Sequence, residues 1–138
     1  FNIVANRSSS PDDVSGWDSG TVLRTAGGVG SNAIYPMILP TSTDSNDPNM
    51  YAIWYANGFI EGRGYDGAGG SWDAAEISIA STTSGEDRRG PSAVVDSLNT
   101  IHLIYSNDTG RIRYRYNVSG TGWADGTDVE RHPASIHR

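Results

Sequence analysis

Residues 90–123 read GPSAVVDSLNTIHLIYSNDTGRIRYRYNVSGTGW, and this stretch decides the fold. Three runs within it, at 92–95, 100–105 and 111–117, are rich in β-branched and aromatic residues, which suit a pleated, half-buried surface. The gaps between the runs carry Asp, Asn, Ser and Gly, which accept the backbone conformations of tight hairpin turns. The stretch therefore predicts a three-stranded antiparallel meander that ends at Trp123.

The same pattern occurs once before in the chain. Residues 35–72 read YPMILPTSTDSNDPNMYAIWYANGFIEGRGYDGAGGSW. Their runs at 35–39, 50–55 and 59–65 match the three later runs in order, and Trp72 takes the place of the final tryptophan. The chain is therefore interpreted as a repeat of one supersecondary unit.

Tryptophans mark the period of this repeat. Trp17 closes a truncated earlier copy, Trp72 lies 55 residues after it, and Trp123 lies 51 residues after Trp72. HPASI at 132–136 matches GPSAV at 90–94 and opens a later copy. A period near fifty, with four short strands per unit, is typical of a β-propeller blade. The alternative is chance self-similarity in a Gly-rich all-β chain, but strand order, turn residues and tryptophan recur together and favour the repeat.

The predicted fold is all-β: a β-propeller segment of about two and three-quarter blades, each a four-stranded antiparallel sheet, in one partial domain at 1–138. Its parts are the end of a truncated blade at 1–24, full blades at 25–80 and 81–131, and the first strand of the next blade at 132–138. Since propellers usually close with about four to eight blades, the rest of the propeller is expected from the same polypeptide or from other chains.

Two local predictions can be checked directly against a structure. In the truncated blade, residues 8–16 are predicted as a polar turn between strands at 1–7 and 17–24. In the first full blade, residues 72–80 are predicted as one continuous fourth strand.

Composition narrows the class of partner and the compartment. The net charge of −6 argues against a nucleic-acid partner, because phosphate binding favours a basic surface. No apolar run approaches the roughly 20 residues that span a bilayer, so no membrane insertion is expected. The chain starts at Phe1 without a signal peptide and is interpreted as a mature or excised segment. Glycosylation sequons at Asn6, Asn107 and Asn117 slightly favour an extracellular or cell-surface location, and the absence of cysteine is neutral.

The turns before two of the tryptophans carry a resemblance to known families. Residues 66–72 (DGAGGSW) and 117–123 (NVSGTGW) resemble the Asp-box of the sialidase (BNR-repeat) superfamily, in which a Ser/Asp/Gly turn ends in Thr-Trp between the third and fourth strands of a blade. This chain has one extra residue, and Asn117 stands where the family has Asp. The same sequence pattern, preceded by Gly-x-Ile at 58–60 and 110–112, also resembles the blades of propeller lectins.

The resemblance covers nearly the whole chain at the level of blades, and it implies a propeller fold. For function it implies a secreted carbohydrate-binding, lectin-like module with a glycan or polysaccharide as partner. In the resembling families this turn lies on the face opposite the ligand. Trp17, Trp72 and Trp123 are therefore predicted to pack between blades, although stacking on a ligand is the alternative for each.

The ligand face of such a propeller is built by the loops that join second to third strands and that lead into the next blade. Arginine forks, carboxylates and aromatic faces in these loops suit sugars, which are bound by directed hydrogen bonds and ring stacking. A solvated charged loop is the alternative for any one of these residues. The predicted glycan-binding residues are Tyr35, Tyr55, Asn57, Asp87, Arg88, Arg89, Asp108, Arg131 and His132.

Complete catalytic constellations do not occur in the sequence. It has no cysteine nucleophile and no HExxH or Ser-His-Asp pattern, and the sialidase arginine triad and Tyr/Glu pair cannot be assembled. Paired carboxylates for glycoside hydrolysis could arise among Glu61, Glu86, Asp87 and Asp108, depending on their separation. The alternatives are thus the non-catalytic part of a sialidase-like glycoside hydrolase or polysaccharide lyase, or a structural or adhesive surface protein. No cofactor and no metal are predicted.

Overall fold

The computed structural model of the chain describes residues 2–10, 13–25, 33–42, 49–75, 77–82, 90–106, 111–118 and 122–126. Within these residues the fold is all-β, with several antiparallel sheets and no helix. The strands are β1 (Ile3–Ala5), β2 (Ser8–Ser10), β3 (Asp13–Trp17), β4 (Thr21–Arg24), β5 (Ala33–Pro40), β6 (Met50–Ala56), β7 (Phe59–Asp66), β8 (Ser71–Trp72), β9 (Ile77–Ser81), β10 (Ser92–Val95), β11 (Ile101–Ser106), β12 (Ile112–Asn117) and β13 (Trp123–Asp125).

The last four strands confirm the predicted meander. β10, β11, β12 and β13 pair in that order and form what we call the third sheet. Asp96 organises its first turn, since its Oδ1 accepts hydrogen bonds from the backbone N–H groups of Leu98 (2.8 Å) and Thr100 (2.9 Å). Asn99 in the same turn has a φ of 60°, a left-handed conformation that asparagine tolerates.

The second sheet is built from β5 to β9. β5, β6, β7 and β8 pair in order, and β6 turns into β7 through Asn57 and Gly58, whose φ angles of 50° and 86° fit a type I′ turn. The single fourth strand predicted for 72–80 is wrong: β8 and β9 pair separately with the two ends of β7. Asp73 accounts for the break, because its Oδ2 accepts a hydrogen bond from the backbone N–H of Gly64 (3.0 Å) and its carbonyl oxygen accepts one from Arg63.

The start of the chain departs further from the prediction. β1 pairs with β4 to form the first sheet. Of the residues predicted as a turn, 8–10 and 13–16 belong instead to β2 and β3, which pair with each other in a separate two-stranded sheet. The strand predicted for 17–24 begins only at Thr21. Before it the chain turns at Asp18, whose Oδ1 accepts hydrogen bonds from the backbone N–H groups of Arg7 (3.1 Å) and Gly20 (2.9 Å), and Gly20 has a φ of 77°.

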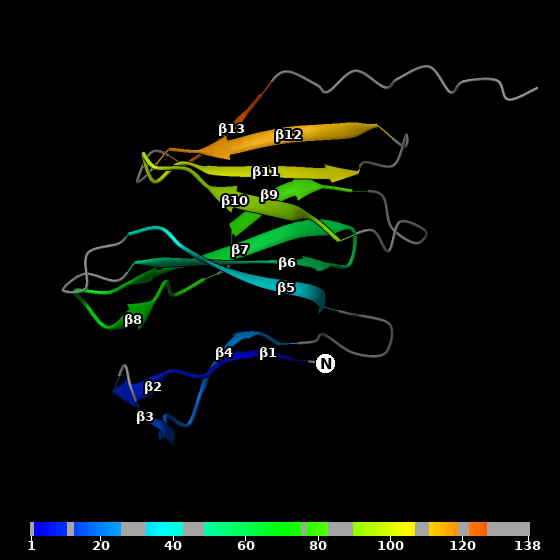
Figure 1. Ribbon diagram of the computed structural model, residues 1–138. Helices are drawn as coiled ribbons and strands as arrows, with labels where there is room; N and C mark the ends of the chain where they lie inside the picture. Colours follow the sequence, from blue (N-terminus) through cyan, green and yellow to red (C-terminus); the bar gives the residue numbers. More distant parts are fainter. Residues whose placement is uncertain are drawn as a thin grey trace, which may run out of the picture.

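The three sheets lie in layers in the order in which they occur along the chain (Figure 1). One apolar cluster packs the first sheet on the second through Ile3, Leu23, Ala52, Trp54 and Ala56. The other cluster packs the second sheet on the third, and its buried members are Tyr51, Ile53, Ile60, Ile79, Ala80, Ile101 and Leu103. The second sheet is therefore covered on both faces.

We call the side of a sheet that faces the preceding sheet its back face, and the opposite side its front face. Equivalent residues of the second and third sheets lie on their back faces. In the second sheet Ala52 and Arg63 are paired neighbours, and both reach the first sheet. In the third sheet Leu103 pairs with Arg115, and Leu103 packs on the second sheet. Ala52 thus corresponds to Leu103, which shifts the predicted match of 50–55 with 100–105 by one residue. Since neighbouring strand residues point to opposite faces, this one-residue shift decides which side chains are buried.

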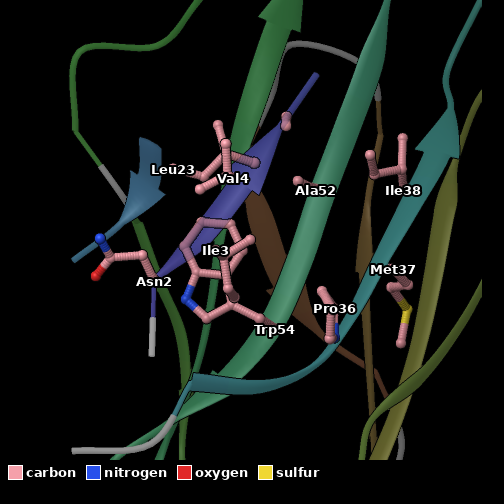
Figure 2. A pocket seen from close by; sticks show the side chains of 10 residues that line it. Asn2, Ile3, Val4, Leu23, Pro36, Met37, Ile38, Ala52 and Trp54 are labelled. Carbon is pink, nitrogen blue, oxygen red and sulfur yellow. The ribbon is translucent and has the colours of Figure 1, made fainter. Parts of the chain in front are cut away.

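The first sheet has only two strands, so it covers the back face of the second sheet incompletely. A groove of about 390 Å³ remains between β1 and β5, beside the core residues Ile3 and Trp54 (Figure 2). Its far wall includes Ile38, which is exposed to 53%. Among the described residues no helix is long and apolar enough to cross a membrane.

Candidate functional site

Three of the nine predicted glycan-binding residues, Tyr35, Tyr55 and Asn57, lie in the described part of the chain. They gather at the end of the second sheet where β6 turns into β7. Tyr35 is 46% exposed, and its ring lies against Gly90, where an added Cβ would be only 2.6 Å from its Cγ. The Tyr55 hydroxyl accepts a hydrogen bond from the backbone N–H of Gly58 (3.1 Å), and Asn57 is exposed in the tight turn.

The remaining predicted residues lie outside the described residues. These are Asp87, Arg88, Arg89, Asp108, Arg131 and His132. The Asn57 loop is a two-residue turn, so the left-handed backbone alone explains an asparagine there. Ligand binding at this end of the sheets therefore stays a prediction.

A cleft at the opposite end of the sheets gathers aromatic and charged side chains that the sequence did not bring together. It has a volume of about 470 Å³ and lies between the first and second sheets, where β7 ends and β8 begins. We call it the first cleft. Its lining includes Arg7, Trp17, Asp18, Arg63, Tyr65 and Trp72.

Trp17 is a partly exposed aromatic residue in the lining of the first cleft. Its side chain is 57% exposed, so the prediction that this tryptophan packs between sheets is wrong. Trp72 does pack: it is half-buried against the core and lies edge-on to Tyr65, with ring centroids 5.2 Å apart. An exposed tryptophan beside a fixed aromatic pair offers a flat surface to an apolar ligand face.

Arg7 is held at the mouth of this cleft by Tyr65. Its guanidinium donates a hydrogen bond to the Tyr65 hydroxyl and lies 5.8 Å from the centroid of that ring. The two residues are 58 positions apart in the sequence, and only the stacking of the first sheet on the second brings them together. Because of this separation in sequence, no local motif could predict the pair.

Arg63 forms the floor of the first cleft and is only 9% exposed. One of its terminal nitrogens donates to the backbone carbonyls of Val22 and Leu23, both at 3.2 Å, and the other donates to the carbonyl of Asp73. Its Nε has no hydrogen-bond partner within the described structure. A buried donor without a partner costs free energy, so this N–H is an unsatisfied group beneath the floor of the first cleft.

Glu61 lies beside this floor but is not available to a substrate. Glu61 is 8% exposed; its carboxylate accepts a hydrogen bond from Trp54 Nε1 (2.9 Å) and forms an ion pair with Arg24 Nε (2.9 Å). The carboxylate thus serves packing of the first sheet on the second. This removes Glu61 from the candidate carboxylates for glycoside hydrolysis, and the other three lie outside the described residues.

A second cleft lies between the second and third sheets, in a position equivalent to that of the first cleft. Its volume is about 730 Å³, and its lining includes Tyr51, Asp73, Arg115, Asn117 and Trp123. By strand pairing, Trp123 takes the place of the first cleft's half-buried tryptophan, and Arg115 takes that of its floor arginine. The Asn117 Oδ1 atom is buried and has no partner within the described structure.

The second cleft is more closed around its tryptophan. Trp123 Nε1 donates to the Tyr51 hydroxyl (3.1 Å), and the two rings meet edge-on at 5.8 Å. Burial raises the pKa of the Tyr51 phenol; the hydrogen bond from Trp123 acts in the opposite direction, and the charge of Asp73 adds to the rise. Trp123 therefore packs as the sequence predicted.

The third sheet carries a hydrogen-bonded cluster of titratable side chains. His102 Nε2 lies 2.9 Å from Asp96 Oδ2, and its Nδ1 lies 2.6 Å from the Tyr114 hydroxyl. The pKa of Asp96 is lowered, chiefly by the hydrogen bond with His102 and then by the backbone N–H of Thr100. Among the described residues no group of three or more His, Asp or Glu side chains is arranged to hold a metal ion.

Comparison of the chain with protein-family models, with curated proteins and with solved structures finds no match.

Proposed function

We propose that this chain is a carbohydrate-binding module of the β-propeller type that holds glycans in the clefts between consecutive sheets. The second and third sheets stack with their equivalent faces pointing in the same direction. This arrangement supports the interpretation of the two sheets as successive blades of one propeller. Under this proposal the protein works at the cell surface or outside the cell, and its partner is a glycan or polysaccharide.

The observation that carries the binding proposal is the first cleft. Trp17, which is 57% exposed, gives the cleft an aromatic wall, Arg7 lies at its mouth, and Arg63 lies at its floor. A sugar ring has an apolar face that stacks on an aromatic ring and hydroxyls that pair with fixed polar groups. Concave sites with an aromatic wall and a few placed polar groups suit such a ligand.

The second cleft extends the proposal to more than one site per chain. It carries the corresponding tryptophan and arginine and its own unpaired buried group, the Asn117 Oδ1 atom. Because its tryptophan already donates to Tyr51, it offers less open aromatic surface than the first cleft. Two sites on one rigid stack would raise the avidity for a branched or repeating glycan.

Replacing Trp17 by alanine is expected to weaken glycan binding by about tenfold to a hundredfold, since burying an apolar side chain of this kind contributes about 1.5–3 kcal/mol. A glycan array first selects the oligosaccharide with the strongest signal, and titration calorimetry with that oligosaccharide measures the loss. Phe59→Ala is the matched control, because Phe59 is also aromatic and exposed (42%) but lies at the other end of the sheets.

A Tyr35→Ala variant separates the cleft from the loop end that the sequence predicted. If Tyr35→Ala removes binding while Trp17→Ala leaves it intact, the ligand lies at the loop end and the cleft proposal is wrong. Absence of any array signal from the folded protein would instead favour the structural or adhesive alternative.

A further inference from the structure

The turn between β6 and β7 contains the only Asn-Gly pair in the sequence, Asn57-Gly58. Asn-Gly pairs are prone to spontaneous deamidation, because glycine has no side chain to hinder attack by its own backbone nitrogen. In this reaction the Gly58 nitrogen loses its proton and bonds to Asn57 Cγ, and the Cγ–Nδ2 bond breaks to release ammonia. Water then opens the succinimide ring to aspartate or isoaspartate, so water is the only other reactant.

The backbone of the turn opposes closure of this ring. The φ angles of Asn57 and Gly58 are 50° and 86°, which fit a type I′ turn. In such a turn the ψ of the first central residue is about +30°, the mirror image of type I. That ψ places the Gly58 nitrogen on the far side of the Cα–C bond from the Asn57 Cβ, whereas the five-membered ring needs both on the same side. The turn must therefore open before the nitrogen can attack.

Tyr55 holds the attacking nitrogen in place. Its hydroxyl accepts a hydrogen bond from the backbone N–H of Gly58 (3.1 Å). The Gly58 carbonyl oxygen accepts another from the backbone N–H of Thr82, just after β9 (2.6 Å). Gly58 is buried, whereas Asn57 is exposed. Because attack requires the Gly58 nitrogen to give up its proton, the hydrogen bond to Tyr55 opposes the reaction.

We infer that Asn57 is a deamidation site and that Tyr55 is the residue that slows its conversion. Isoaspartate carries the main chain through the former side chain, which adds one carbon atom to the turn and leaves a carboxylate on it. The length of a two-residue turn sets the register of its strands. Conversion is therefore expected to disturb the neighbouring pairing of Phe59 with Ser81 in β9. The inference does not rest on glycan binding.

The test compares the wild-type chain with Tyr55→Phe under the same mildly alkaline conditions, and peptide mapping by mass spectrometry follows the peptide that contains Asn57. Folded Tyr55→Phe is expected to deamidate about two- to tenfold faster than the folded wild-type chain, the range that corresponds to one neutral hydrogen bond. In guanidinium, where both chains are unfolded, their rates are expected to be equal and faster than either folded rate. Asn57→Gly is the control that assigns the mass change, because Gly-Gly also suits a type I′ turn and has no amide to lose.

Equal rates for the two folded chains, or a rate difference that persists in guanidinium, would overturn the role of Tyr55. A folded wild-type chain that deamidates as fast as the unfolded chain would overturn the restraint by the turn. A wild-type chain that does not deamidate even when unfolded would remove Asn57 as a site. Circular dichroism checks that Tyr55→Phe is folded.

Amide hydrogen exchange of the wild-type chain is a second test that needs no variant. The Gly58 N–H is expected to be protected from exchange, and free exchange of this proton would contradict its bond to Tyr55.

Discussion

Replacing Trp54 by alanine is expected to lower the free energy of unfolding by about 3–5 kcal/mol. Trp54 is fully buried and packs with Ile3 and Leu23 between the first and second sheets. Truncation leaves a large cavity there and also removes the indole N–H that donates to Glu61. Chemical denaturation followed by circular dichroism measures the loss.

Trp17→Ala is the matched control for this prediction, because the same side chain is removed from an exposed position. Its effect on stability is expected to be clearly smaller than that of Trp54→Ala, because less apolar surface is buried at this position. A Trp54→Ala loss as small as that of Trp17→Ala would contradict the packing of the first sheet on the second.

Glu61→Ala is expected to lower the free energy of unfolding by about 3 kcal/mol, at the low end of the cost of breaking a buried ion pair. The low end applies because the side chain of Arg24, its partner, is 22% exposed and keeps part of its hydration. The substitution also leaves the buried indole N–H of Trp54 without its acceptor. Denaturation at low and high salt measures both the loss and its screening.

Glu61→Gln distinguishes the two contributions, because the amide oxygen can still accept from Trp54 while the charge is lost. We expect it to recover part of the loss. Equal losses for Glu61→Ala and Glu61→Gln would show that the hydrogen bond to Trp54 contributes nothing. A loss that vanishes at high salt would show that the pair is exposed to solvent.

Local chemistry is what made the two later meanders predictable from the sequence. Alternating β-branched and aromatic residues are enough to place β6, β7, β11 and β12, and Asn57-Gly58 specifies its own turn. The break after Trp72 could not be predicted in this way. It depends on Arg63 and Gly64, which lie on the neighbouring strand and bond to Asp73.

The candidate site was harder to predict because it forms between sheets. Arg7 meets Tyr65 across 58 residues, and Trp123 meets Tyr51 across 72 residues. The repeated tryptophans all line the clefts between sheets, but their burial differs. Trp72 packs against Tyr65, whereas Trp17 is 57% exposed. Only the way in which successive sheets stack decides that difference.

The most direct test of cleft binding uses the four tryptophans as probes in a two-dimensional NMR titration with the best oligosaccharide from the array, since each indole N–H gives one signal. The signals of Trp17 and Trp72 are expected to shift and saturate together. The signal of Trp54, which is buried and bonded to Glu61, is expected to stay in place. Unmoved Trp17 and Trp72 signals at saturating oligosaccharide would contradict binding in the first cleft.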